Sequence, residues 1–452
     1  MKFDKNILAF ICLHTSWWNI YPPQDLAIIK TKEDIYSKWK YYLKNDYKEH
    51  KRVWLYMHTP FCEAKCIFCS CGSKKILWWN ILNSYLEKVS KELEYFSDLF
   101  KNIKLNHAYF WWWTPSIYNP QQLELLLSSI REYYDFEKNA QFDFEISPHT
   151  ITEEKIKILK KYWVSRITIW IQTMTKDSLE FNNRFQTWTE IKNAFSWIRK
   201  YNIENINVDL MPWIPWENLK SFLVNLKKII ELWPDMIHLY PFRPSKETLF
   251  SKNWYNYTNK DIKNRDLMYE LWIKLIEKYW YYWVENDSWW KKDNARNEQE
   301  VDKIVNNCSI LGFWYPARSY IHKNLMYFTW YDMYKKDEPI YMWIEMKKDD
   351  YMARYIISHF RSGFSLDDFY KEFKINFTDY YLKEIDFLEK NNIAYVKNWF
   401  LKTNINNVFD KLLFSKIFYT EENIKFLLEK FNYNKNINYI KKFKDTLSAS
   451  YK

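Results

Sequence analysis

Between residues 53 and 279 the sequence alternates short apolar runs with longer amphipathic segments. The apolar runs predict strands, whereas the amphipathic segments carry apolar residues at helical spacing. The predicted strands cover 53–58, 107–110, 142–146, 166–171, 205–210 and 236–240, and the predicted helices cover 84–99, 121–134, 153–162, 177–182, 190–201, 219–232 and 260–279. Regular alternation implies right-handed crossovers between parallel strands. The sequence therefore predicts an α/β fold with about six strand–helix units and a parallel sheet.

Four of the six cysteines are crowded into residues 62–71. Cys62, Cys66 and Cys69 have C-x3-C-x2-C spacing, and Cys71 follows two residues later. Three thiolates can hold an iron–sulfur cube and leave one iron open, whereas cubes with four thiolates typically only carry electrons. Zinc is the weaker alternative because its structural sites usually pair two distant knuckles, and a disulfide framework would need more cysteines. We therefore expect Cys62, Cys66 and Cys69 to be metal ligands, and Cys71 not to be one.

The residues around these cysteines resemble the radical SAM superfamily, in particular its oxygen-independent coproporphyrinogen III oxidase branch. Tyr56-x-His-x-Pro-Phe-Cys precedes the cluster loop, and Cys-x-Phe68-Cys-x-Cys lies within it. The resemblance implies that the strand–helix units form a partial (β/α)6 barrel, short of a complete eight-unit barrel. It also implies a 4Fe–4S cluster and one or two molecules of S-adenosylmethionine (SAM), which the reduced cluster would cleave to a 5′-deoxyadenosyl radical. Tyr56 and Phe68 would then lie near the cluster and SAM. The alternative for both is an ordinary place in the aromatic core.

The chain contains only 3 glycines but 26 tryptophans. Average glycine usage of about 7% would give roughly 32 glycines in a chain of this length. Trp163, Trp233 and Trp280 follow predicted helices at the point where a left-handed cap takes Gly or Asn, and Asn202 stands at the matching point of another helix. We hypothesise that most of these tryptophans are glycines in the cell, encoded by UGA. The alternative is a genuinely tryptophan-rich protein, for which UGG codons would be expected.

Glycine at Trp111, Trp112 and Trp113 would convert Trp-Trp-Trp-Thr114-Pro-Ser into Gly-Gly-Gly-Thr-Pro-Ser. This segment resembles the second signature of the same family. The resemblance implies that residues 112, 113 and 114 bind SAM, since a glycine backbone can approach a ligand closely. The alternative for three adjacent tryptophans is a core or interface patch.

Four further polar residues stand at or just beyond the ends of successive predicted strands. Glu145, Gln172 and Asp209 end strands, and Arg184 follows in Asn-Arg. Each alone is more often a surface or capping residue, but strand ends line the mouth of a barrel. By resemblance, Glu145 would accept hydrogen bonds from the amino group or ribose of SAM. Gln172, Arg184 and Asp209 match positions that contact SAM, one of two molecules bound in the family.

We predict four regions: an N-terminal arm (1–52), the barrel (53–290), a segment that closes the barrel (291–347) and a mainly helical, winged-helix-like C-terminal domain (348–452). The absence of an apolar run of about 18 residues predicts no membrane span. No signal-peptide cleavage site is evident, so we expect a cytoplasmic protein. The net charge is +11, and lysines are interspersed with acidic residues, so an ordinary solvated surface is the first interpretation. Attraction of an anionic substrate is the second interpretation, and nucleic-acid binding is the third.

The resemblance implies oxidative decarboxylation of coproporphyrinogen III to protoporphyrinogen IX by a monomer. Flavodoxin or ferredoxin would supply electrons, and no catalytic side chain is assigned. The sequence departs from the family in His238-Leu-Tyr-Pro-Phe-Arg243, where relatives carry Asn-Tyr-Ala, and at Arg318, where they carry an aliphatic residue. Two alternatives therefore stay open: a heme chaperone and a radical SAM methyltransferase that opens heme. Cys69-x-Cys71 favours the oxidase, because chaperone-type relatives usually lack the last cysteine.

Overall fold

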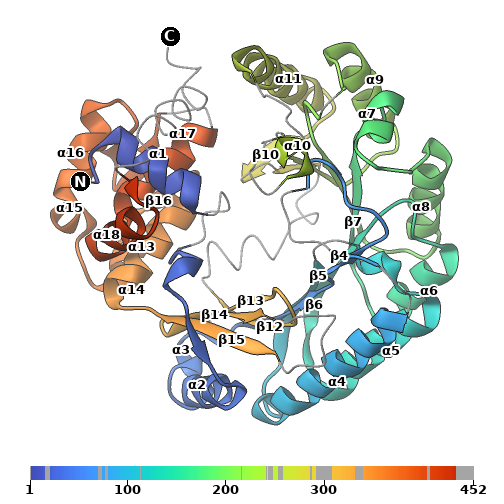
Figure 1. The fold of residues 1–452 in the computed structure, drawn as a ribbon, viewed down its shortest axis with the longest axis horizontal. Helices are drawn as coiled ribbons and strands as arrows, with labels where there is room; N and C mark the ends of the chain where they lie inside the picture. The colour runs from blue at the N-terminus through green and yellow to red at the C-terminus, as the bar shows by residue number, and fades with distance from the viewer. Residues whose placement is uncertain are drawn as a thin grey trace.

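Six parallel strands form the centre of the computed structural model (Figure 1). The structure describes residues 2–15, 21–69, 74–76, 80–111, 114–214, 216–240, 242, 248–252, 258–285, 288–291, 308–330, 339–404 and 408–433. The parallel strands are β2 (Val53–His58), β5 (Leu105–Trp111), β6 (Phe136–Ile146), β7 (Arg166–Gln172), β8 (Asn205–Leu210) and β9 (Met236–Leu239). Each pairs in parallel with the next along the chain. The predicted partial (β/α)6 barrel is therefore confirmed.

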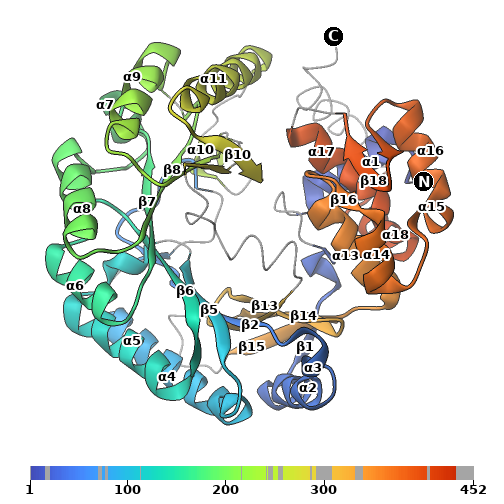
Figure 2. The ribbon, with the colours of Figure 1, turned by 180° about the vertical axis from the view of Figure 1, so that it is seen from behind.

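Helices cover the outer face of this sheet (Figure 2). They are α4 (Asn80–Phe100), α5 (Pro120–Tyr133), α6 (Glu153–Lys161), α7 (Lys176–Phe181), α8 (Trp188–Lys200), α9 (Leu219–Ile230) and α11 (Asn259–Glu277). The short α10 (Leu249–Lys252) lies inside this ring (Figure 1), where the amide of Phe250 donates to the carbonyl of Ile67 at 3.0 Å. Several begin with reciprocal capping hydrogen bonds, such as those between Thr187 and Glu190 at α8. Their apolar faces and the outward residues of the strands form one large core. The inner face of the sheet is left for the polar residues described below.

The sheet continues beyond the six parallel strands to thirteen strands in total. On one side, β12 (Ser309–Phe313) runs parallel to β2 and is followed by antiparallel β13 (Arg318–Ile321), β14 (Leu325–Trp330), β15 (Ile340–Glu345) and β1 (Ile28–Lys30). On the other side, β11 (Ser288–Trp290) and β10 (Tyr282–Glu285) follow β9. One sheet therefore crosses the predicted region boundaries after residues 52 and 290. It is an open crescent whose two ends face each other across a gap (Figure 1).

The C-terminal region is a separate helical body at the open side of the crescent (Figures 1 and 2). It contains α13 (Lys348–His359), α14 (Leu366–Phe373), α15 (Phe377–Tyr380), α16 (Leu382–Lys390), α17 (Val408–Ser415), the 3-10 turn η4 (Lys416–Phe418) and α18 (Glu421–Lys430). Strands β16 (Phe364–Ser365), β17 (Ala394–Lys397) and β18 (Phe400–Thr403) form a small sheet in the order β16-β18-β17. Helices preceding a two-stranded wing give the winged-helix-like arrangement that the sequence predicted.

One part of the N-terminal arm packs against the large sheet, and another part packs against the C-terminal body. Helices α2 (Lys32–Asn45) and α3 (Tyr47–His50) lie outside the sheet near β15, whereas α1 (Lys5–His14) packs in the core of the C-terminal body. The 3-10 turn η1 (Gln24–Leu26) connects them. The sequence did not predict α1. Residues 7–12 are buried on all sides, so this helix lacks the polar face by which amphipathic helices are recognised.

A buried hydrogen-bond network attaches the arm to the C-terminal body. The Tyr21 hydroxyl donates to Oδ1 of Asp350 at 2.7 Å and accepts from Nδ2 of Asn423 at 2.6 Å. Nη1 of Arg354 donates to the Tyr21 carbonyl at 3.1 Å. Burial is the largest cause that raises the pKa of Tyr21, and the Asp350 carboxylate adds to it, so the hydroxyl stays protonated. The network joins residues 21, 350 and 423, which are far apart in the sequence.

Several tryptophans have left-handed backbone conformations. Trp163, Trp233 and Trp280 have φ values of 65°, 57° and 69°, and Asn202 has 52°. The predicted left-handed positions after these helices are therefore confirmed. Trp213, Trp216, Trp314 and Trp399 also have φ between 57° and 68°. A left-handed backbone conformation costs glycine little free energy, whereas it strains the backbone of a bulky residue.

In the part of the chain that the structure describes, no helix combines the length and the apolarity needed to cross a bilayer.

Candidate functional site

The loop after β2 carries the three cysteines expected to bind the cluster. Cys62 ends the short strand β3 (Phe61–Cys62), which pairs with β4 (Lys74–Lys75), and the amide of Cys69 donates to the carbonyl of Cys66 at 3.1 Å. All three side chains are half-buried. The loop therefore holds the thiols at the C-terminal end of a parallel strand, the end at which barrel enzymes place their chemistry.

The thiols are close enough to influence one another electrostatically. Burial is the main cause that raises the pKa values of Cys62 and Cys66, and the neighbouring cysteines add to it. A partly buried thiolate would be stabilised by a bound metal, so this donor set fits an iron–sulfur cluster. As they stand, no three His, Cys, Asp or Glu side chains of the described residues are gathered closely enough to hold a metal ion.

Two predicted cofactor residues contact the cysteines directly. Oγ1 of Thr114, which follows β5, lies 3.3 Å from Sγ of Cys62. Nη1 of Arg184 donates to Sγ of Cys66 at 3.6 Å. Arg184 is held by the side chain of Gln186, whose own amide donates to the Thr173 carbonyl at 3.0 Å. The structure therefore places the threonine of the second signature and the predicted arginine beside the cluster loop.

Tyr56 and Glu145 share the inner face of the sheet near this loop. Tyr56 pairs in register with Tyr109 on β5, and the Tyr109 hydroxyl donates to Oε1 of Glu145 at 2.9 Å. The Tyr56 hydroxyl lies 2.7 Å from Nδ1 of His58. Burial, and then the charge of Arg318, hold the pKa of His58 well below its usual range, so this imidazole is neutral. Tyr56 and Glu145 are thus joined through Tyr109 into one polar layer.

Asp209 lies further along the same inner face, between Trp170 on β7 and His238 on β9. Its Oδ1 accepts from Nδ2 of Asn207 at 2.9 Å and lies 3.2 Å from Nδ1 of His238. The Tyr240 hydroxyl lies 3.3 Å from the same imidazole nitrogen. The structure therefore adds a histidine and an asparagine to the predicted aspartate.

Gln172 ends β7 with a left-handed φ of 63°. Its side chain is buried. It faces a small pocket formed with the turn before α9, apart from the cysteines. Phe68 lies half-buried in the turn between Cys66 and Cys69. Cys71, Trp112, Trp113 and Arg243 lie outside the described residues, as does the side chain of Trp111.

Sequence reasoning missed Tyr109, Asn207 and Glu217 as members of the site. A signal for the first two was present, because polar residues recur at every second position of otherwise apolar strands, as in Asn205-Ile-Asn207-Val-Asp209. That alternation marks one polar face of a buried strand. Glu217 lies in a turn and carried no such signal.

Comparison with known proteins identifies similar sequences and similar solved structures. Residues 56–229 match the family model of the radical SAM superfamily. The chain is 28% identical over 201 residues to the heme chaperone HemW of Haemophilus influenzae, covering 44% of this chain and 52% of that protein. It is 29% identical over 189 residues to the oxygen-independent coproporphyrinogen III oxidase of a Synechocystis strain, covering 42% of this chain and 41% of that protein. The chain thus spans about half the length of these relatives.

The structure resembles a solved structure along nearly its whole length. Coproporphyrinogen III oxidase (HemN) from Escherichia coli, described as a radical SAM enzyme, superposes with a TM-score of 0.74 at 18% identity. The match covers 94% of this chain and 98% of that one. At this identity the likeness establishes the common fold, including the C-terminal body.

Proposed function

Because residues 56–229 belong to the radical SAM superfamily, we propose that this protein carries out the oxygen-independent decarboxylation of coproporphyrinogen III to protoporphyrinogen IX. Cys62, Cys66 and Cys69 would hold a 4Fe–4S cluster. The bound cluster and SAM would supply a 5′-deoxyadenosyl radical that removes a hydrogen atom from a propionate side chain, after which CO2 leaves and one electron passes to an external acceptor. The observation that carries the proposal is the contact of Thr114 and Arg184 with two of these cysteines.

We assign SAM binding to the inner face of the sheet beside the cysteine loop. Tyr56, Phe68, Glu145 and the backbone of residues 112–114 would bind the first molecule or line its site. Gln172, Arg184 and Asp209 would contact SAM, one of the two molecules that the family binds. Arg184 supplies a permanent cation that can pair with a carboxylate.

The proposed cofactor site requires glycine at several tryptophan positions. Trp170 is in register with Asp209 and therefore projects from the same face as this proposed SAM contact. A tryptophan there takes space that a cofactor would need. We define the glycine form as the chain with Trp→Gly at residues 111, 112, 113, 163, 170, 213, 216, 233, 280, 314 and 399. We propose that this form corresponds more closely to the protein in the cell.

In the cell, we propose a cytoplasmic monomer that receives electrons from reduced flavodoxin or ferredoxin. The net charge of +11 would favour a substrate that carries four carboxylates. Sites for these partners are not assigned to particular residues.

A heme chaperone is the second candidate, because a heme chaperone is among the relatives at comparable identity. Purified glycine form with a reconstituted cluster should be tested anaerobically in two assays. In the first, coproporphyrinogen III, SAM and dithionite are added, and porphyrins are separated after oxidation. In the second, heme is titrated and followed by its absorbance. Formation of protoporphyrin with two CO2 lost per molecule supports the oxidase, whereas stoichiometric heme binding without decarboxylation would replace it with the chaperone.

A further inference from the structure

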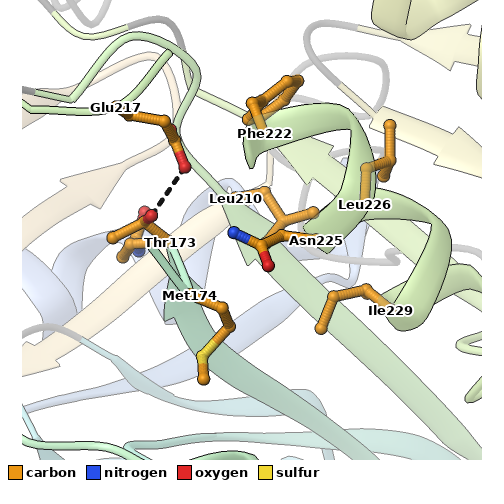
Figure 3. Close-up of a pocket in the computed structure, with 9 residues that line it drawn as sticks. Thr173, Met174, Leu210, Glu217, Phe222, Asn225, Leu226 and Ile229 are labelled. Atoms are coloured by element: carbon orange, nitrogen blue, oxygen red, sulfur yellow. Dashed lines mark hydrogen bonds between the residues drawn. The ribbon is translucent and has the colours of Figure 1, made fainter. Parts of the chain in front are cut away.

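Glu217 is a buried carboxyl group in the turn between β8 and α9. Only 5% of the residue is exposed. It borders a small pocket whose walls include the apolar side chains of Leu210, Phe222 and Ile229 (Figure 3). An ionised carboxylate in such surroundings loses its hydration, which costs free energy unless the charge is paired.

Among the described residues, the side-chain hydrogen bonds that the Glu217 carboxyl accepts come from hydroxyl groups. Oγ1 of Thr173 donates to Oε1 of Glu217 at 2.6 Å, and Oγ1 of Thr175 donates to the same oxygen at 3.1 Å. Nδ2 of Asn225 on α9 donates in turn to Oγ1 of Thr175 at 3.1 Å. None of the residues lining the pocket from β7, β8 or α9 is titratable or charged apart from Glu217 itself. Burial raises the pKa of Glu217 to about 8, although the two hydroxyls oppose it.

Two oxygen atoms of this pocket lack hydrogen-bond partners among the described residues. One is Oε2 of Glu217, the carboxyl oxygen not used by the threonines, and the other is Oε1 of Gln172. Both atoms are buried acceptors when Glu217 is ionised, so neither can satisfy the other. Protonation turns Oε2 into a donor and removes this mismatch. Buried polar atoms without partners are costly, so the geometry itself favours the protonated state.

We propose that Glu217 is a positioning residue whose protonated carboxyl donates a hydrogen bond, directly or through one water, to Oε1 of Gln172. The bond occupies the acceptor of the Gln172 amide inside the pocket. The Nε2 donors of Gln172 can then bind an acceptor that lies outside the pocket. This inference rests on the proposed function, in which Gln172 binds SAM. Loss of the proton would release Gln172 and weaken SAM binding.

The test compares SAM affinity at pH 7 and pH 9 by calorimetry, with the cluster reconstituted in the glycine form. If one proton with a pKa of about 8 controls Gln172, SAM should bind up to about tenfold more weakly at pH 9. Glu217→Gln keeps the shape and a donor at all pH values, and should bind equally at both. Glu217→Leu removes the donor and should bind weakly at both. The matched control is Glu231→Gln, an exposed carboxyl at the end of α9, which should retain the pH dependence.

A second measurement does not depend on SAM. The infrared band of a protonated carboxyl should be present at pH 7, disappear toward pH 9 and be missing from Glu217→Gln. Absence of that band, or a pH dependence of SAM binding that persists in Glu217→Gln, would overturn the inference. If the unsubstituted glycine form bound no SAM at either pH, the proposed function would fail. The infrared band would then decide by itself whether Glu217 is protonated.

Discussion

Replacing the exposed left-handed tryptophans with glycine should stabilise the protein. Trp163, Trp216, Trp233, Trp280 and Trp399 all have positive φ, and their side chains are between 57% and 81% exposed. A tryptophan at such a position is strained and also gains little from burial. The perturbation is the variant with glycine at all five positions.

The expected increase in the free energy of unfolding is the difference between two opposing contributions. The left-handed conformation costs a non-glycine residue about 1–2 kcal/mol, whereas the flexibility of glycine in the unfolded chain costs about 0.5–1 kcal/mol. The net gain is about 0.5–1 kcal/mol per site, or about 2.5–5 kcal/mol for five distant sites that act additively. Contacts reduce it at three sites, since Arg131 stacks on Trp163, Lys291 lies over Trp233 and Phe181 packs against Trp216. Trp280, the most exposed, should give the clearest single-site gain.

The assay is urea unfolding followed by far-ultraviolet circular dichroism, which does not depend on tryptophan fluorescence. The five-glycine variant should unfold at a higher urea concentration than the sequence as written. The matched control is Leu125→Gly, an exposed helical residue of α5. It should lower stability by about 1 kcal/mol, because glycine is unfavourable inside a helix. A five-glycine variant no more stable than the original would refute the strain argument and favour native tryptophans. Peptide masses from the natural source would then identify the residue at each position directly.

Three further predictions concern the cluster, the arm and pH. Ala substitution of Cys62, Cys66 or Cys69 should abolish 4Fe–4S absorbance and SAM cleavage, whereas the Cys71→Ala variant should retain both. Cluster loss in Cys71→Ala equal to that in the other three variants would contradict the three-ligand assignment. Tyr21→Phe should destabilise the C-terminal body by about 1–3 kcal/mol, measured by limited proteolysis and urea unfolding, because Asp350 and Asn423 lose a buried partner; Tyr41→Phe, which is exposed, is the control. The folded pKa of Glu217, about 8, exceeds the usual carboxyl value of 4.5, so the native state holds a proton that the unfolded chain releases. Its contribution to stability should therefore fall as pH rises from about 4.5 to about 8, by at most about 1.4 kcal/mol per pH unit, and urea midpoints of Glu217→Gln should lack that slope.

The parallel core could be predicted from the sequence because its signals are local. The strands at 53–58 and 205–210 agree with the prediction at both ends. Strand β6 begins at Phe136 rather than at residue 142, because its first residues include the polar stretch Glu137–Asn139 and continue the ladder beside Leu105. The pairing of β12 with β2 depends on residues more than 250 positions apart. No local pattern reveals such a contact.

Only those residues of the candidate site that belong to a recognisable sequence pattern could be predicted. The cysteine spacing and the strand-end residues could be recognised in the sequence, and the structure brings Thr114 and Arg184 to the cysteines. His238 could not be predicted as a partner of Asp209, because it meets this carboxylate from the neighbouring strand β9, whereas Asn207 lies two residues before Asp209 on the same strand. The left-handed Trp163, Trp233 and Trp280 were predictable because helix ends follow a local geometric rule. Trp213, Trp216, Trp314 and Trp399 lie in turns, to which that rule does not apply.

The Tyr21 network has a consequence for the timing of synthesis. Tyr21 and Asn423 are 402 residues apart, and the apolar helix α1 packs against the same C-terminal core. A ribosome that adds about 5–20 residues per second needs roughly 20–80 s to produce the second partner after the first. During this interval the buried side chains of Ile7–Cys12 have no native surface to cover them. Helix α1 therefore leaves the ribosome long before its partners and is among the last segments to fold, and the nascent chain must shield this helix from aggregation until the C-terminal body has been synthesised.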